Sequence, residues 1–365
     1  YKVPNGMSYN SYVILDEKIA VMDTVDGFFT EEWLNNVEQV LSGKTPDYLV
    51  IQHMEPDHSA SIPAFLKKYP NATVVSTAKG FQFMEQFFPE FFAGQGLPAE
   101  QRIVAANDGV LELGQHSLHF VYAPMVHWPE VMMTYEATEK ILFAADGFGK
   151  FGALDAEEEW ADEARRYYIG IVGKYGPQVQ AVLKKAAGLD IQTICSLHGP
   201  VLKENLGFYL EKYDKWSSYQ PEESGVVIAY ASVYGNTRNA AEYLADVLQE
   251  KGQKTVLYDL ARCDKAKAVA DAFRYDRLVL AGITYNGDLF PCMRSFIEGL
   301  TERNYQNRKV AIIENGTWAP MAGKLILGMF EKSKNLTFTE TTVSIKSAMN
   351  EQNKGEIGKL AEELS

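Results

Sequence analysis

The sequence has few cysteines and no long apolar run, and both shortages argue against several classes of protein. Cys195, Cys263 and Cys292 are far apart and form no C-x-x-C pair. This spacing argues against a disulfide framework, a zinc ribbon and a four-thiolate iron site, and it is typical of a reducing compartment. No stretch approaches the roughly 18 apolar residues of a membrane span, and the start at Tyr1 does not read as a signal peptide. We therefore expect a cytoplasmic protein.

The sequence also has fewer basic than acidic residues. The 365 residues include 35 Lys and Arg against 48 Asp and Glu, which gives a net charge of -13. Nucleic acids and anionic membranes both attract basic surfaces, so we expect neither as a partner. A chain of this length is long enough for two domains, each with a core of its own.

A polar segment that contains Pro221 separates two regions with different patterns. It predicts domains at residues 1–218 and 224–365. In the second region, apolar runs alternate with helical patterns, which predicts a doubly wound parallel sheet of five strands. In the first region, hairpin signals mix with strand–helix units, which predicts sheets covered by helices. Helices are expected there at 30–41, 62–68, 79–88 and 161–187.

Four residues of metal-ligand type occur within the six-residue run His53-Met54-Glu55-Pro56-Asp57-His58. The run follows the apolar strand pattern Tyr48-Leu49-Val50-Ile51. Residues two apart in an extended segment point the same way, so His53, Glu55 and Asp57 can converge. Pro56 restricts the turn, and His58 is placed to open the next helix.

Three further candidate ligands each follow an apolar strand pattern: His127, Asp146 and His198. Loops at one rim of a sheet can assemble a site from such positions. Seven candidates are too many for one tetrahedral zinc ion, and they suit two metals that share a bridge. Carboxylates and imidazoles without thiolate favour iron or manganese, with zinc still possible.

The second region opens with a strand, the loop Ser232-Val233-Tyr234-Gly235-Asn236-Thr237 and a helix. Such a loop presents backbone N–H groups and a helix N-terminus to a phosphate. Neither a Walker loop nor G-x-G-x-x-G is present. Two later strand ends carry polar loops on the same rim, and Trp318 can stack on a ring. Together they favour flavin mononucleotide (FMN), with candidate contacts also at Thr284, Tyr285, Asn286, Gly287, Asn315, Gly316, Thr317 and Trp318.

The first region resembles the metallo-β-lactamase fold, whose zinc hydrolases carry H-x-H-x-D-H. Glu55 stands here in place of the second His, and H-x-E-x-D-H is similar to the flavodiiron proteins (A-type flavoproteins). The second region resembles flavodoxin. The resemblance spans essentially the whole chain and implies a metallo-β-lactamase-like αββα sandwich followed by a flavodoxin-like sheet, without a rubredoxin extension. From the resemblance we expect the sequence to begin after the family's first short segment. Residues 146–151 depart from the D-A-F-G-Q-H of the family.

The resemblance also implies ligand roles and an activity. His53, Glu55 and His127 would hold one iron, Asp57, His58 and His198 would surround the other, and Asp146 would bridge them. In some members the His at position 58 does not reach the metal. A reduced flavin and a diferrous pair supply two electrons each, enough to reduce dioxygen to two waters. Two electrons suffice to couple two nitric oxides into nitrous oxide, and the sequence leaves the choice of gas open.

The same resemblance implies the partners. These are a separate electron donor, such as rubredoxin, a rubredoxin reductase system or a reduced deazaflavin, and a second copy of the chain in a head-to-tail homodimer or a dimer of dimers. Two alternatives stay open. One is a zinc hydrolase fused to a flavodoxin domain, against which Glu55 argues. The other is a flavin electron carrier on a structural scaffold, against which the seven-ligand set argues.

Overall fold

The computed structural model describes residues 2–94 and 96–365, which form two compact units with separate cores. The N-terminal unit holds Val3–Tyr167 and Pro177–Tyr213. The C-terminal unit holds Tyr168–Gly176 and Asp214–Ser365. The domain limits 1–218 and 224–365 stay a prediction.

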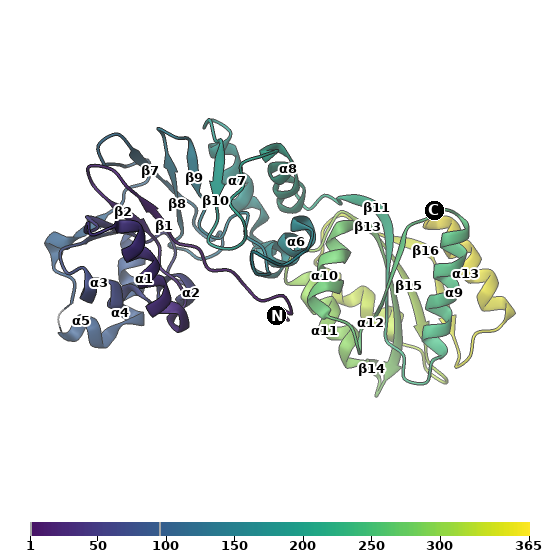
Figure 1. The fold of residues 1–365 in the computed structure, drawn as a ribbon. Helices are drawn as coiled ribbons and strands as arrows, with labels where there is room; N and C mark the ends of the chain where they lie inside the picture. Colours follow the sequence, from purple (N-terminus) through teal and green to yellow (C-terminus); the bar gives the residue numbers. More distant parts are fainter. Residues whose placement is uncertain (1, 95) are drawn as a thin grey trace. The chain divides into compact units, whose positions relative to one another are not determined.

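The N-terminal unit contains two five-stranded sheets (Figure 1). In the first sheet β1 pairs antiparallel with β2, and β2 to β5 run parallel. The second sheet is antiparallel except for its parallel pair β9 and β10. The strands of the first are β1 (Tyr12–Ile14), β2 (Ala20–Met22), β3 (Tyr48–Val50), β4 (Thr73–Ser76) and β5 (Arg102–Val104). Those of the second, in spatial order, are β10 (Thr193–Cys195), β9 (Ile141–Phe143), β8 (Met132–Glu136), β7 (Ser117–Tyr122) and β6 (Val110–Glu112).

Alternation along the first sheet builds a core on each of its faces. Val21, Leu49 and Val74 pack with apolar residues of the helices. Their neighbours Met22 and Val50 face the other way and pack with residues of the second sheet. This period of two is what a sheet buried on both faces requires. The helices of the unit are α1 (Thr30–Leu41), α2 (Pro56–Ser59), α3 (Ile62–Lys68), α4 (Ala78–Phe87), α5 (Pro89–Gly94), α7 (Gly176–Ala186) and α8 (Leu206–Ser217).

The single helix predicted at 161–187 is wrong. The structure has α6 (Trp160–Ile171), a 3-10 turn at Gly173–Tyr175 and then α7. Pro177 lacks the N–H that a continuous helix would need, and it is tolerated in the first turn of a new one. The glycines at 173 and 176 weaken the helix at the same place.

The C-terminal unit has the predicted doubly wound sheet, in the order β12-β11-β13-β15-β16 with all neighbours parallel. The short β14 adds an antiparallel pair to the end of β13. Helices α9 and α13 pack on one face of the sheet, and α10, α11 and α12 lie on the other (Figure 1). The strands are β11 (Glu223–Tyr230), β12 (Thr255–Asp259), β13 (Tyr275–Tyr285), β14 (Asp288–Leu289), β15 (Arg308–Asn315) and β16 (Leu336–Ile345). The helices are α9 (Asn236–Glu250), α10 (Lys265–Arg274), α11 (Pro291–Thr301), α12 (Ala322–Met329) and α13 (Glu351–Glu363).

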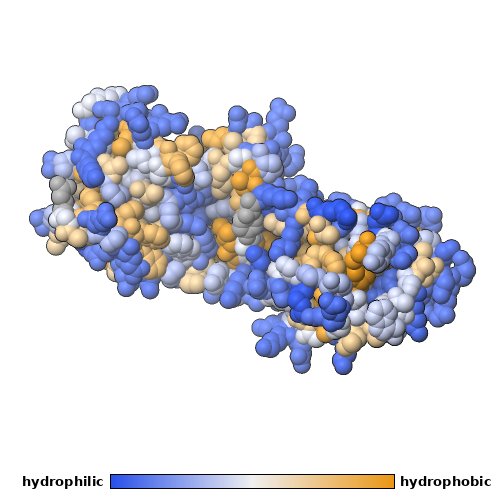
Figure 2. Space-filling view, turned by 90° about the horizontal axis from the view of Figure 1, so that it is seen from below, coloured by the Kyte–Doolittle hydropathy of each residue, from blue (hydrophilic) through white to orange (hydrophobic). Residues whose placement is uncertain are grey.

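The surface is largely hydrophilic on the face that Figure 2 shows, with apolar patches between the polar side chains. This agrees with a chain in which 23% of the residues are charged. Among the helices that the structure describes, none combines the length and apolar character needed to cross a membrane.

Candidate functional site

Four strand ends in the N-terminal unit deliver the candidate metal ligands. His53 follows β3, His127 follows β7, Asp146 follows β9 and His198 follows β10. Glu55 stands at the N-cap position of α2, a helix that Pro56 begins. The first turn of that helix then places Asp57 and His58 beside the strand-end residues.

The structure brings all seven predicted ligands together in two neighbouring groups of ligand atoms. Within each group, the ligand atoms lie within 4.8 Å of one another. The ligand roles themselves stay a prediction. The first group is His53, Glu55, His127 and Asp146, and the second is Asp57, His58 and His198.

Asp146 lies between the two groups with one carboxylate oxygen toward each. Its Oδ2 is 3.0 Å from His127 Nε2 and 3.6 Å from His53 Nε2. Its Oδ1 is 3.0 Å from His58 Nε2 and 3.7 Å from His198 Nε2. A carboxylate held this way has the geometry of a bridge between two cations.

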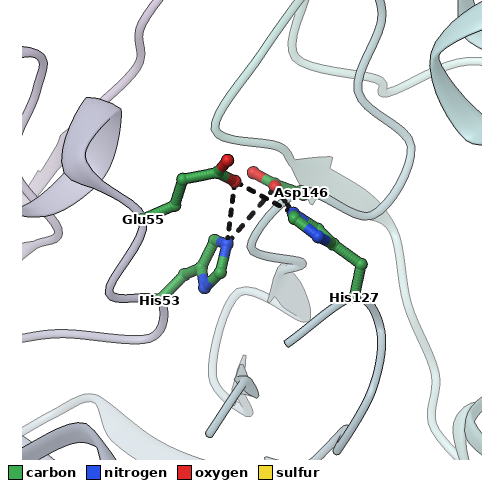
Figure 3. Close-up of side chains that lie close together, drawn as sticks. All are labelled: His53, Glu55, His127 and Asp146. Carbon is green, nitrogen blue, oxygen red and sulfur yellow. Dashed lines mark hydrogen bonds and ion pairs between the residues drawn. The ribbon is translucent and has the colours of Figure 1, made fainter. Parts of the chain in front are cut away.

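Glu55 completes the first group, and Figure 3 shows it facing the imidazoles of His53 and His127. Its Oε2 is 3.0 Å from His127 Nε2 and 3.3 Å from His53 Nε2. One ring nitrogen of His53 points into the group and the other points away from it (Figure 3). The group therefore offers two imidazole nitrogens and two carboxylates to one point.

The second group brings two imidazole nitrogens face to face. His58 Nε2 and His198 Nε2 are 3.1 Å apart, and each is 3.4 Å from Asp57 Oδ2. His198 Nδ1 donates to the backbone oxygen of Ser8 at 2.7 Å, so its Nε2 carries a lone pair in the neutral ring. His58 Nε2 faces this lone pair, so that a proton or a metal ion can lie between the two nitrogens. The donor set fits a metal.

The C-terminal unit has a pocket of about 590 Å³ at the carboxyl ends of its central strands. This volume is within the range of small-molecule and cofactor sites. Of the fourteen residues predicted to contact a flavin, thirteen line the pocket, and Gly235 lies in the same loop without lining it. Their contact with FMN stays a prediction. Four lining residues were not predicted: Ile283, Ala319, Met321 and Ser347.

One end of the pocket has the features of a phosphate site. Gly235 has a φ of +92° and stands at the N-cap position of α9, where the first N–H groups of the helix are unpaired. Its own N–H donates to Ser232 Oγ at 3.2 Å. Asn315 Nδ2 contacts Thr237 Oγ1 at 3.3 Å and the Ser347 backbone oxygen at 2.9 Å, which ties three strand-end loops together.

Two aromatic residues that line the pocket are exposed to solvent. Trp318 is 90% exposed and Tyr234 is 93% exposed. Large aromatic side chains bury 150–250 Å² when they pack, so two bare rings at the mouth of one pocket are suited to cover a flat ligand. These residues fit FMN.

Comparisons with known proteins agree with both candidate sites. The family model described as ODP family beta lactamase matches residues 7–199, and a flavodoxin domain model matches residues 227–336. The first match covers more than half of the chain. The chain belongs to the ODP β-lactamase family.

This ODP family member has the two-domain architecture of the flavodiiron proteins. It aligns with the rubredoxin oxygen:oxidoreductase of Desulfovibrio gigas at a TM-score of 0.89 and 25% identity, over 99% of this chain and 90% of the other. The flavodiiron protein of Giardia intestinalis gives 0.89 and 26%, over 100% and 91%. The predicted fold class is confirmed, and FMN and a diiron centre are the cofactors that its domains and metal cluster support.

A curated relative extends the comparison. The chain is 28% identical over 331 residues to the anaerobic nitric oxide reductase flavorubredoxin of Vibrio vulnificus, and the alignment covers 87% of this chain. This chain spans 65% of the length of that relative.

Without a metal, the candidate metal site of this ODP family member holds a proton where a metal would bind. Burial lowers the pKa of His127, but hydrogen bonds to Asp146 and Glu55 outweigh it and raise the pKa to about 9. Burial raises the pKa of Glu55, but its bonds to His127 and His53 lower it to about 2. The pKa of Asp146 lies well below its usual value, because the neighbouring histidines outweigh its burial. Cations are thus favoured between these carboxylates.

We expect metal binding to this site to release protons and to strengthen as the pH rises from about 6.5 to about 9. The raised pKa of His127 means that a metal displaces a proton from Nε2. The same shift stabilises the metal-free fold fully below pH 6.5, and this stabilisation is lost as the pH rises through about 9. Calorimetric titration of the metal-free protein with Zn²⁺ at several pH values measures the metal affinity and the number of protons released. An affinity independent of pH would contradict the expectation.

Aromatic residues lie beside the metal groups of this family member: Trp128 is half-buried, and Phe148 and Tyr213 are buried. The Trp128 ring meets His53 edge-on, with centroids 5.3 Å apart. The ring of Phe148, two residues after Asp146, stacks on that of Tyr213, with centroids 4.2 Å apart. The backbone N–H of Phe148 donates to the Tyr213 hydroxyl at 2.6 Å. Trp128 and Phe148 are thus close in the sequence to two of the candidate ligands, His127 and Asp146.

Tyr167 is a site residue that the sequence analysis missed. Its side chain is buried, and its ring lies 5.4 Å from that of His198. Burial, followed by the charges of Asp146 and Asp57, raises its pKa well above the usual value. The phenol therefore keeps its proton near these carboxylates. In the sequence Tyr167 is one apolar position of a helical pattern, and nothing there separates it from a core residue.

Proposed function

We propose that this protein is an oxidoreductase that reduces dioxygen, nitric oxide or both at a diiron centre, with FMN returning electrons to the irons. The observation that carries the proposal is the Asp146 carboxylate, which has one oxygen on each group of ligands. Glu55, which stands where the zinc hydrolases of this fold carry a second His, argues against a hydrolase. The flavin pocket of the C-terminal unit supplies the reason for two redox metals.

When bound, the two irons and the flavin supply up to four electrons to a small gas. The chain's own residues bind the metals, limit the entry of water and hold a proton. Asp146 would hold both metals, and Glu55 and Asp57 would each add a negative charge to one of them. Trp128 and Phe148 limit the entry of water beside the ligands. The Tyr167 hydroxyl keeps a proton near the Asp146 carboxylate.

The names of relatives support both gases. The Vibrio vulnificus relative is named a nitric oxide reductase, and the Desulfovibrio gigas structure is named an oxygen oxidoreductase. Both reactions place the gas at the same kind of site, so the ligands alone favour neither. We propose that the protein takes electrons from a separate carrier such as rubredoxin, a rubredoxin reductase system or a reduced deazaflavin, and that it works in the cytoplasm.

We also propose a head-to-tail homodimer, or a dimer of such dimers, that brings the flavin of one chain to the irons of another. Electron transfer between two cofactors requires them to be close, and a symmetric dimer with two equivalent contacts satisfies this twice. Sedimentation at working concentration, with turnover measured in the same sample, tests the assembly. A fully active monomer would contradict it.

The direct test of the proposed function compares two metal loadings of one preparation. Protein made free of metal and oxygen is loaded with FMN and then with either Fe²⁺ or Zn²⁺. With reductant in excess, we expect only the iron form to turn dioxygen into water or nitric oxide into nitrous oxide, because zinc has no redox chemistry. The zinc form can pass only flavin electrons to dioxygen, which yields hydrogen peroxide. Equal yields of water or nitrous oxide from both forms, or none from either, would contradict the proposal. Ester or phosphodiester cleavage by the zinc form alone would favour the hydrolase instead.

A further inference from the structure

The two groups of metal ligands have matching compositions. Each offers two imidazoles and one carboxylate of its own, and they share Asp146. The atoms that would touch the metals therefore give no reason for the two metals to differ. A difference can come only from what stands behind the ligands, and outer partners orient histidines and tune their basicity.

The outer partners of the histidines are unequal. His53 Nδ1 lies 2.8 Å from Glu130 Oε1, so a negatively charged acceptor stands behind the first group. In the second group, His198 Nδ1 donates to a neutral acceptor, the Ser8 backbone oxygen, at 2.7 Å. His58 Nδ1 is buried and has no hydrogen-bond partner among residues 2–94 and 96–365.

Glu130 is held firmly in its place. Its side chain is 1% exposed, and Oε1 also accepts from the backbone N–H of Met54 at 2.9 Å. Its own backbone oxygen accepts from Thr77 Oγ1 at 3.1 Å. Its second oxygen, Oε2, is buried without a hydrogen-bond partner in the part of the chain that the structure describes. Burying a carboxylate is costly unless a positive charge compensates it, and a metal on the far side of His53 supplies that charge.

We propose that Glu130 is a positioning residue that makes the two metals inequivalent. It holds the proton of His53 on Nδ1, which leaves Nε2 to bind the metal, and its negative charge makes that imidazole a stronger donor. The metal of the first group is then bound more tightly and oxidised more easily than the metal of the second. The inference rests on the proposed diiron site.

The variant Glu130→Gln tests this without removing the contacts. The amide oxygen can accept from Met54 and His53 as Oε1 does, and the amide nitrogen takes the place of the partnerless Oε2. Only the charge is lost. The matched control is Glu136→Gln. Glu136 is also 1% exposed, and it accepts backbone N–H groups from Thr138 and Glu139 at 2.7 Å each, away from the metal ligands.

The measurement is an anaerobic titration of the metal-free, FMN-loaded full chain with Fe²⁺ alone. In Glu130→Gln we expect one of the two ferrous ions to bind about 10–100-fold more weakly, the usual effect of losing an outer partner. The other ion and both ions of Glu136→Gln should bind as in the wild type. A redox titration of the irons should show one of their two potentials raised, since a positive metal loses a nearby negative charge.

Three results would overturn the inference: unchanged iron binding in Glu130→Gln, equal weakening of both ions, or the same selective loss in Glu136→Gln. Each of these is independent of the proposed function. Wild-type protein that binds two irons and reduces gas keeps that function whatever the Glu130 variant does. Wild-type protein that binds two irons but reduces neither gas loses the function, while the Glu130 test still applies.

Discussion

Replacing Asp146 by asparagine is expected to lower the iron content from two ions per chain to one or fewer and to reduce gas turnover by at least about 100-fold. The substitution keeps the size of the side chain but removes the charge that both groups of imidazoles face. Loss of an outer partner already costs about 10–100-fold, and Asp146 would bind both metals itself. Iron analysis and turnover with reductant in excess measure the two effects.

The matched control for this variant is Asp190→Asn. Asp190 is 66% exposed and pairs with Lys140 at the surface of the same unit, and such pairs contribute little to stability. Its iron content and turnover should equal those of the wild type. The FMN content of both variants should also be unchanged. Two irons retained in Asp146→Asn would show that the carboxylate does not bridge the metals.

Replacing Trp318 by alanine is expected to weaken FMN binding by about tenfold to a hundredfold. Aromatic stacking on a planar ring contributes about 1–3 kcal/mol, and each 1.4 kcal/mol is a factor of ten in affinity. Trp318 is exposed at the mouth of the pocket, so its removal leaves no cavity in the core. Fluorescence titration of the flavin-free protein with FMN measures the change.

The control for the flavin pocket is Phe28→Ala. Phe28 is an equally bare aromatic residue, 96% exposed, but it lies in the N-terminal unit and does not line the pocket. FMN should bind to this variant as it does to the wild type. Unchanged binding in Trp318→Ala would mean that the exposed ring does not cover the flavin, and the pocket's role would then rest on its phosphate end.

The ligand positions could be predicted because their signal is local. His53 to His58 form one short run after a strand, and His127, Asp146 and His198 each follow an apolar strand. Residue type and strand periodicity are enough to place them on one rim. The orientation of Asp146 between two groups depends on packing of the two sheets, and no sequence pattern contains that information.

Other site residues could not be predicted for the same reason. Glu130 and Tyr167 act through partners far away in the sequence, His53 and Asp146. A buried carboxylate after a Pro, or a Tyr in a helical pattern, has many possible partners before the chain is folded. Ser347 is different. It follows the fifth strand of the C-terminal sheet, on the same rim as the predicted loops, and that position could have identified it.

The most direct test of the central claim is the number of electrons that reach one gas molecule. Protein loaded with iron and FMN is fully reduced, freed of excess reductant and titrated anaerobically with dioxygen. The account predicts that one dioxygen per chain reoxidises both the flavin and the irons and that no hydrogen peroxide forms. Reoxidation of the flavin alone, with one hydrogen peroxide per chain, would show that the metal centre takes no part and would contradict the account.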